Sequence, residues 1–129
     1  MKPLIVLAAA LSLAGCVSTQ PITDNDFIEQ VLPIDHDTAL KNLREGWQKC
    51  NDARFGQPSY IQFEDHTSID VYGLTPHLKQ RTDQMIGRVE LWSLVDATRV
   101  RSGMPQNFNR KRRQNWLDWA AGNLDCKIK

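Results

Sequence analysis

The sequence predicts an α+β domain, in which a curved antiparallel sheet is packed by two helices. Three patterns support this class. Apolar residues recur at helical spacing in one segment near residue 45 and in a second near the C-terminus. Between these segments the apolar period shortens to two residues, in stretches that short polar turns interrupt. Such stretches are typical of β-hairpins, and hairpins flanked by helices are typical of this class of domain.

The first expected element is the apolar-rich run of residues 27–32, which Pro33 ends. With a period of two, Phe27, Glu29 and Val31 share one face of a strand. With a helical period, the apolar residues of the same run share one side of a short turn of helix. We expect a strand, so the sheet would contain two hairpins and a possible N-terminal strand.

The helix that follows is the most clearly patterned element. Asp37 is a favourable N-cap for a helix that begins at Thr38. Apolar side chains then recur along one side of the helix, at Leu40, Leu43, Trp47 and Cys50. Charged and amide side chains occupy the remaining surface, so we expect the helix to lie with one face on the core.

Two hairpins are expected next. The first has a polar turn at residues 65–68, and the second closes near Asp96 and Ala97 before returning over residues 98–102. Residues 75–85, between the hairpins, show no period and are expected to form a polar loop. The last helix is expected over residues 107–121, where Gly122 is placed to end it.

This pairing would divide the side chains between two faces of the sheet. The helices are expected to cover Ile61, Phe63, Ile69, Val71, Val89, Leu91 and Val100. The opposite face would carry Tyr60 and Tyr72, with Trp92 across from Arg101 and Leu94 across from Arg99. Arginines beside aromatic rings form cation–π contacts and are enriched at recognition surfaces. Alternatively, the N-terminal strand or the 75–85 loop covers Trp92 and Leu94.

The N-terminus has the parts of a secretory signal. Lys2 is followed by an apolar run of about twelve residues, which is shorter than the roughly twenty needed to span a bilayer. Leu13-Ala14-Gly15-Cys16 resembles the lipobox of bacterial lipoproteins. This resemblance implies that residues 1–15 are removed, that Cys16 is lipidated, and that residues 16–23 form a tether for a domain spanning 24–129. Val17 and Ser18 then imply the periplasmic face of the outer membrane. The order of elements in the domain is similar to that of helix-grip domains, which recur in periplasmic lipoproteins.

Removing the signal leaves 15 basic and 15 acidic residues, because only Lys2 among the 16 basic residues is lost. This balance argues against a nucleic-acid partner. Lipidation would use one of three cysteines, and the remaining Cys50 and Cys126 are expected to form a disulfide in an oxidising compartment. A simple up-and-down order of four strands would place these two cysteines at opposite ends of the domain. Either the strand order differs, the tail after Gly122 folds back, or the disulfide is not formed.

Candidate catalytic and metal-binding residues are few. His36 lies between two aspartates, and His66 follows Glu64 and Asp65. Adjacent residues rarely bind one metal ion together, and the spacing of a zinc site is missing. The sequence also lacks the Gly-x-Ser-x-Gly elbow of serine hydrolases. We therefore expect no enzyme activity, metal or cofactor. A hydrolase or metalloenzyme would need His36 or His66 to meet a carboxylate from a distant segment.

The charge pattern has two interpretations. Residues 97–117 contain six basic residues and no acidic one, and four of the six are consecutive, at Arg110, Lys111, Arg112 and Arg113. Such a run could contact anionic lipid or an acidic partner. It could equally be a solvated face that balances the acidic segment before residue 40.

The sequence thus predicts a lipid-anchored, non-enzymatic binding or scaffold module that contacts an envelope protein. The predicted contact surface comprises Tyr72, Arg88, Trp92, Arg99 and Arg101, with residues 110–113 at its margin. The alternative is a carrier or sensor of a small apolar ligand or lipid. That ligand would occupy a pocket lined by Phe63, Leu91, Trp116 and Trp119.

Overall fold

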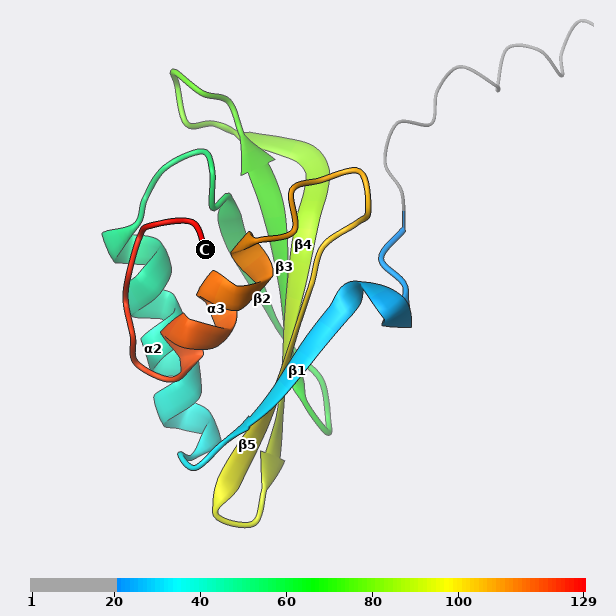
Figure 1. The fold of residues 1–129 in the computed structure, drawn as a ribbon, viewed down its shortest axis with the longest axis vertical. Helices are drawn as coiled ribbons and strands as arrows, with labels where there is room; N and C mark the ends of the chain where they lie inside the picture. Colours follow the sequence, from blue (N-terminus) through cyan, green and yellow to red (C-terminus); the bar gives the residue numbers. More distant parts are fainter. Residues whose placement is uncertain (1–20) are drawn as a thin grey trace, which may run out of the picture.

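A five-stranded antiparallel sheet organises the domain, with the strands in the order β1-β5-β4-β3-β2 (Figure 1). The computed structural model describes residues 21–129, so the expected signal peptide and the lipidation site Cys16 lie outside the described residues. The elements are η2 (Asp24–Asp26), β1 (Phe27–Leu32), α2 (His36–Lys49), β2 (Gln57–Gln62), β3 (Thr67–Leu74), β4 (Arg81–Leu94), β5 (Ala97–Gly103) and α3 (Arg112–Ala120). The predicted α+β class is confirmed.

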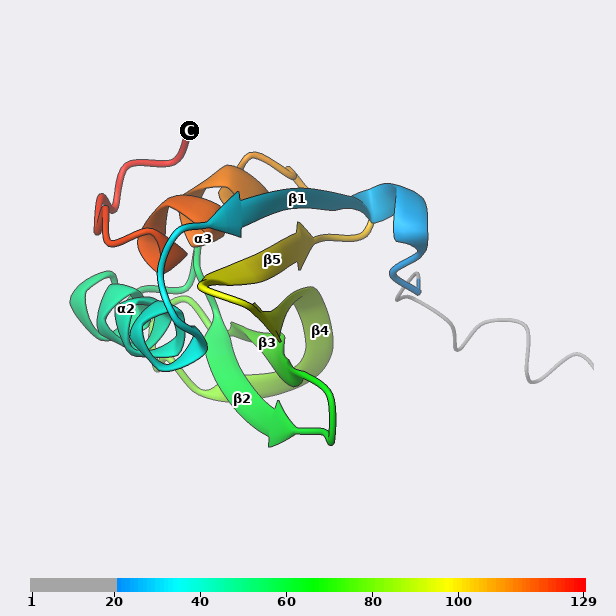
Figure 2. The ribbon, with the colours of Figure 1, turned by 90° about the horizontal axis from the view of Figure 1, so that it is seen from below.

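The sheet curves around the two helices, which both lie on its concave side (Figure 2). Residues 27–32 form the expected strand, and β1 pairs with β5 at one edge of the sheet. The last strand in sequence therefore lies between the first strand and β4. The four strands between the helices keep the simple up-and-down order, and β1 is added beside β5, which leaves β1 and β2 as the two edge strands.

Helix α2 begins two residues earlier than expected. Asp35, not Asp37, is the N-cap: its backbone is extended, and its carboxylate accepts a hydrogen bond from the Thr38 amide at 2.8 Å. An N-cap carboxylate bonds the third amide of the helix, so a cap at Asp35 places Asp37 inside the first turn. The core-facing side chains of α2 include Leu43 and Trp47, as the spacing predicted.

The predicted faces of the first hairpin are wrong for β2. Tyr60 lies across from Ile69 and therefore shares the helix side of the sheet, whereas Ile61 lies across from Ser68 on the opposite side. Ile61 and Phe63 are accordingly 38% and 47% exposed. A shift of one residue moves every side chain of a strand to the other face. Because Tyr60 and Ile61 place large apolar side chains in both phases of β2, the sequence pattern does not decide which phase faces the helices.

Strand β4 is longer than expected, and the predicted 75–85 loop is shortened to residues 75–80. The start of β4 alternates between exposed and half-buried residues, and it carries no continuous apolar face. Irregular pairing with β3 near Tyr72 marks the same region. A strand is recognised in a sequence by apolar residues at every second position, so this end of β4, which is partly solvated on both sides, could not be predicted in that way.

The second hairpin keeps its predicted faces but changes its register. Trp92 lies across from Arg99, and Leu94 across from Ala97, so the two-residue turn is Val95-Asp96. Asp96 has a φ of 59°, a left-handed conformation that aspartate tolerates in tight turns. The predicted pairs of Trp92 with Arg101 and Leu94 with Arg99 are therefore wrong by two residues.

Helix α3 is shorter than predicted. It starts at Arg112, because the residues before it form turns and not helix. The Arg113 and Gln114 amides donate to the carbonyls three residues earlier, those of Arg110 and Lys111. The predicted end is close, since Gly122 follows the C-cap with a φ of 100°. Trp116 and Trp119 project from α3 into the core, where both are fully buried.

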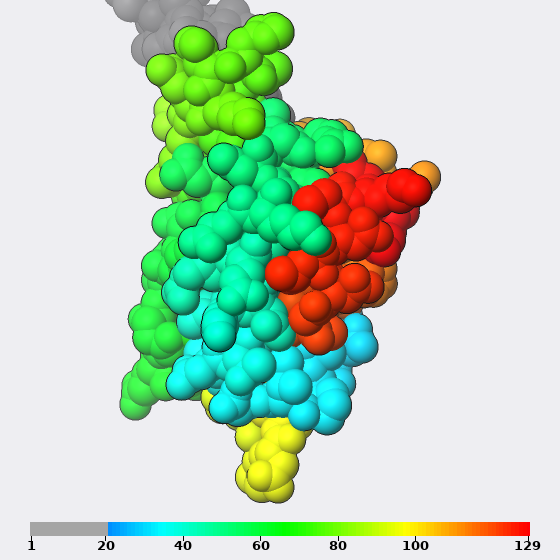
Figure 3. All heavy atoms as spheres, turned by 90° about the vertical axis from the view of Figure 1, so that its left-hand side faces the viewer, coloured from blue at the N-terminus to red at the C-terminus, as the bar shows by residue number. Residues whose placement is uncertain are grey.

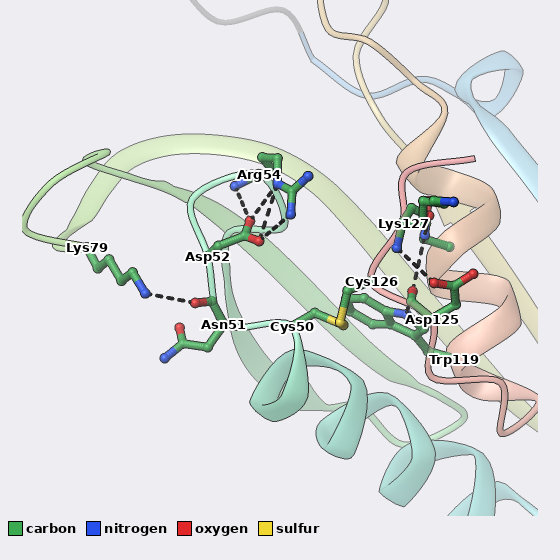
Figure 4. A network of polar contacts seen from close by, with 10 residues as sticks. Cys50, Asn51, Asp52, Arg54, Lys79, Trp119, Asp125, Cys126 and Lys127 are labelled. Carbon is green, nitrogen blue, oxygen red and sulfur yellow. Dashed lines mark hydrogen bonds and ion pairs between the residues drawn. A yellow bond between two sulfur atoms is a disulfide. The ribbon is translucent and has the colours of Figure 1, made fainter.

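The predicted Cys50–Cys126 disulfide is present, with the two Cα atoms 5.3 Å apart. The tail after Gly122 folds back, which removes the conflict between the disulfide and the directions of the helices. Four hydrogen bonds join Asn115 or Trp119 of α3 to backbone groups of the tail. The Asn115 amide donates to the carbonyls of Asp125 and Lys127 and accepts from the Lys129 amide. The Trp119 indole donates to the Asp125 carbonyl (Figure 4).

Candidate functional site

The outer face of the sheet is the side turned away from α2 and α3 (Figure 2). The strand register assigns four of the predicted contact residues to it: Arg88 and Trp92 on β4, and Arg99 and Arg101 on β5. It adds others that the sequence analysis did not place there. These are Phe27, Glu29 and Val31 from β1, Ser68 and Asp70 from β3, and Ile61 from β2.

Four side chains on the outer face stack in one row across the sheet. The Arg99 guanidinium carbon lies 4.4 Å from the Trp92 ring centroid. The Trp92 and His66 rings are stacked with centroids 5.0 Å apart, and the His66 and Phe63 rings with centroids 4.8 Å apart. We call Phe63, His66, Trp92 and Arg99 the stacked row.

Polar contacts fix two members of the stacked row, Arg99 at its end and His66 within it. Arg99 Nε donates to Glu29 Oε1 at 3.0 Å, and His66 Nδ1 lies 2.7 Å from Asp65 Oδ1. The His66 ring holds the pKa of the Asp65 carboxyl below its ordinary range by hydrogen bonding to it. Trp92 is half-buried, so its neighbours in the row hold its faces while part of the ring stays accessible. The N-terminal strand does not cover it, because β1 pairs with β5 instead.

A second group of contacts lies beside the stacked row. The Arg101 guanidinium carbon is 4.1 Å from the Phe27 ring centroid and 5.8 Å from that of Trp92. The same guanidinium forms ion pairs with Asp24 at 3.3 Å and with Glu90 at 3.6 Å. Arg101 therefore links the two aromatic rings while its charge is neutralised by two carboxylates.

Arg88 and Tyr72 are also engaged within the domain. Arg88 Nε lies 2.7 Å from Asp70 Oδ1, and Asp70 is only 8% exposed. The Arg81 guanidinium carbon lies 3.9 Å from the Tyr72 ring centroid. All three arginines of the predicted surface are thus paired with acidic residues. The outer face offers apolar side chains and ring edges rather than free positive charge.

The basic run 110–113 is largely engaged in contacts within the domain. Arg110 Nη1 lies 3.1 Å from Asp26 Oδ1, and Arg113 Nη1 donates to the Asp26 carbonyl at 2.8 Å. Burial lowers the pKa of the Arg112 guanidinium, and the nearby Arg54 charge lowers it further. Only Lys111 is exposed. Arg110 and Arg113 thus contact Asp26 of the acidic segment, as the interpretation of a charge balance predicted. Three of the four bases are half-buried, however, so the run is not the fully solvated face of that interpretation.

The two histidine clusters meet in one hollow at the end of the sheet. The hollow measures about 340 Å³ and is lined by His36, Asp37, Gln62, Glu64, Asp65, His66 and Ser93. His36 Nε2 lies 2.9 Å from Thr67 Oγ1, whose hydroxyl donates to Gln62 Oε1 at 2.6 Å. Because that hydroxyl already donates, it accepts from His36, which fixes the proton on Nε2.

The ion pairs in this hollow are local in sequence. Each histidine pairs with the carboxylate next to it in sequence, and not with one from a distant segment. Within residues 21–129, no three histidine, cysteine or acidic side chains are grouped so that they could hold a metal ion. The hydrogen bonds among His36, Thr67 and Gln62 join the start of α2 to the ends of β2 and β3.

The residues predicted to line an apolar ligand pocket do not come together. Leu91, Trp116 and Trp119 are fully buried in the core, whereas Phe63 lies on the outer face. Trp47 fills the space between the helices, with its ring centroid 5.9 Å from that of Trp116 and 5.4 Å from that of Trp119. Packing of this kind occupies the volume that a carried ligand would need.

The sequence matches no protein-family model, and no curated protein matches it either. Neither helix in the part of the chain from residue 21 onward combines the length and the apolar character that crossing a bilayer requires.

Proposed function

We propose that the protein is an outer-membrane lipoprotein whose periplasmic domain is a non-enzymatic binding module in the cell envelope. The lipobox-like sequence that ends at Cys16 supports the lipid anchor, and Val17 and Ser18 support the outer membrane. The Cys50–Cys126 disulfide is typical of an oxidising compartment and agrees with this location. The domain would work by holding an envelope protein against its outer face.

The observation that carries the binding role is the stacked row. Its four planar side chains are ordered before any partner arrives, so binding would lose little side-chain entropy. Aromatic and arginine side chains are also the residues that contribute most at protein interfaces. In a domain of this size, the aromatic rings would be expected to lie in the core if they served stability alone.

The charges on the outer face limit the kind of partner. Because Arg88, Arg99 and Arg101 already pair with carboxylates, an acidic partner would have to break those pairs. Exposed apolar side chains surround the row, notably Val31 at 54% and Leu94 at 44%. The face therefore fits a partner that contributes apolar and aromatic side chains, with a polar rim.

Site-specific photocrosslinking in cells tests this role. A photoreactive phenylalanine analogue replaces Val31, which lies beside Arg99 on the outer face. The control replaces Lys41, whose side chain is 72% exposed on α2. We expect one envelope protein to crosslink from position 31 and not from position 41, and Trp92→Ala to reduce the yield while the chain keeps its fold. Equal crosslinking from both positions, or none from position 31, would contradict the proposal.

A further inference from the structure

A groove runs between α2 and the free edge of β2, on the helix side of the sheet. Two adjoining hollows of about 370 and 290 Å³ form it, and they share Trp47, Asn51, Gln57 and Pro58. Figure 3 faces this side of the molecule, with α2 in cyan to teal and the β2 region in green beside it. The groove is separate from the outer face, and its two hollows share no lining residue with the hollow of the two histidines, which Gln62 at the end of β2 lines.

The backbone of β2 offers hydrogen-bonding groups along this groove. The strand pairs with β3 on one side only. At the turn, the Phe63 amide donates to the His66 carbonyl, so the backbone groups of Phe63 point toward β3. Backbone groups alternate in direction along an antiparallel strand, and the pairing of β2 with β3 is unbroken. The amides and carbonyls of Tyr60 and Gln62 therefore point away from β3.

Pro58 agrees with this assignment. It lies in the same phase as Tyr60, so the amide that proline lacks would have pointed away from β3 and out of the ladder. A proline within a strand is tolerated at such an edge position. Its carbonyl adds a further free acceptor to the edge.

The side chains around the groove are basic, aromatic and neutral polar. Arg44 contributes a guanidinium 5.2 Å from the Tyr60 ring centroid, and Lys79 lies at the other end, where its Nζ bonds the Asn51 carbonyl. The floor is Trp47, whose position is fixed because its indole donates to the Phe55 carbonyl at 3.1 Å. The residues that line the two hollows include these two bases and no acidic side chain.

We propose that this groove binds an extended acidic segment of a partner protein as an additional strand beside β2. The segment's backbone would bond the free groups of Tyr60 and Gln62, as in other complexes that form by strand addition. Alternate side chains of the segment would lie over Trp47, and its carboxylates would meet Arg44 and Lys79. This is a second binding site, so the domain could hold two partners at once.

Peptide binding to the mature chain, made without lipid through Cys16→Ser, tests the site. The probe is a blocked peptide of alternating glutamate and valine, and its counterpart carries lysine in place of glutamate. We expect only the acidic peptide to slow hydrogen exchange at the Tyr60 and Gln62 amides. The double variant Arg44→Gln/Lys79→Gln should weaken binding about fivefold, as loss of exposed ion pairs would. Equal binding of both peptides, or binding of neither, would overturn the proposal.

A pair of substitutions separates strand addition from simple charge attraction. Tyr60→Pro removes the outward amide without breaking a bond to β3, whereas Tyr60→Val keeps that amide. We expect Tyr60→Pro to abolish peptide binding and Tyr60→Val to retain most of it, with both variants folded by near-ultraviolet circular dichroism. Binding that survives Tyr60→Pro would overturn strand addition. A concentration-dependent dimer that Tyr60→Pro abolishes would overturn the proposed partner segment and would identify a second copy of the chain as the occupant of the groove.

Discussion

The carboxylate of Asp26 lies 3.1 Å from the guanidinium of Arg110, across 84 residues of sequence. Asp26 is only 2% exposed, and it also accepts hydrogen bonds from the amide and the hydroxyl of Thr23. An acidic side chain at the start of the domain therefore neutralises Arg110, which lies just before the start of α3 in the basic run. This contact explains why a run of four bases next to a helix start is tolerated.

We predict that Asp26→Asn lowers the free energy of unfolding by about 1–3 kcal/mol, because it leaves a partly buried guanidinium without its charged partner. Urea unfolding of Asp26→Asn, Arg110→Gln and the double variant measures the coupling between the two side chains. The control is Lys111→Gln, at an exposed position of the same run, which should change stability by less than about 0.5 kcal/mol. Additive effects of the two substitutions would contradict the assignment.

The close approach of α2 to α3 gives a second prediction. A Cβ atom on Gly46 would lie 2.5 Å from two ring atoms of Trp119. Gly46→Ala should therefore destabilise the domain by about 1–3 kcal/mol, as overpacking does, although alanine favours helix more than glycine. Gln48→Ala, on the exposed side of α2, serves as the control. An unchanged or raised urea midpoint for Gly46→Ala would show that Trp119 moves aside freely.

The Cys50–Cys126 disulfide closes a loop over a sequence separation of 76 residues. On the chain-entropy model, removing it with Cys50→Ser/Cys126→Ser should lower stability by about 4 kcal/mol. The tail keeps its bonds to Asn115 and Trp119, so we expect the reduced domain to fold with a less protected tail. Hydrogen exchange should then rise at Lys127 and Lys129 before it rises in the sheet. Uniform loss of protection would contradict this order.

Acid should destabilise the domain through several carboxyls. Hydrogen bonds from Thr38 lower the pKa of Asp35 below its ordinary 3.8, and a hydrogen bond from Arg54 lowers that of Asp52. A lowered pKa means that the folded state favours the ionised form. The stabilisation by these carboxylates is therefore complete above pH 3.8, and it is lost as the pH falls through their lowered pKa values in the folded state.

Asp35→Asn isolates one contribution to this acid loss. Asparagine also caps helices well, so the variant should keep α2 intact at neutral pH but should not titrate. We expect urea midpoints of Asp35→Asn to fall less than those of the native protein between about pH 4 and pH 2. Parallel falls in the two proteins would mean that the Asp35 cap does not contribute to acid sensitivity.

The sequence predicted those features that depend on local pattern or on residue count. The helical spacing from Leu40 to Trp47 predicted α2, and the two cysteines outside the lipobox-like sequence predicted the disulfide. The phase of β2 was not predictable in the same way, because Tyr60, Ile61 and Phe63 make both of its faces partly apolar. The pairing of Tyr60 with Ile69, which only the folded hairpin fixes, decides between them.

The candidate site was predicted in part for a related reason. Trp92, Arg99 and Arg101 follow from the alternation within one hairpin, so they could be placed on one face without knowing the exact register. His66 and Glu29 come from a turn and from an edge strand, and they join the site only through pairing between elements far apart in sequence. The short turn from Phe63 to His66 is a sequence signal that could have suggested the stacking of these two rings.

The location of the domain is the central claim, because the binding role in the envelope depends on a lipid at Cys16. Intact mass spectrometry of the protein purified from membranes tests it most directly. We predict a chain that begins at Cys16 and carries a diacylglycerol and a further acyl group, with the Cys16→Ser variant lacking that added mass. A mature chain that begins elsewhere, or an unmodified Cys16, would contradict the anchor and the envelope role proposed with it.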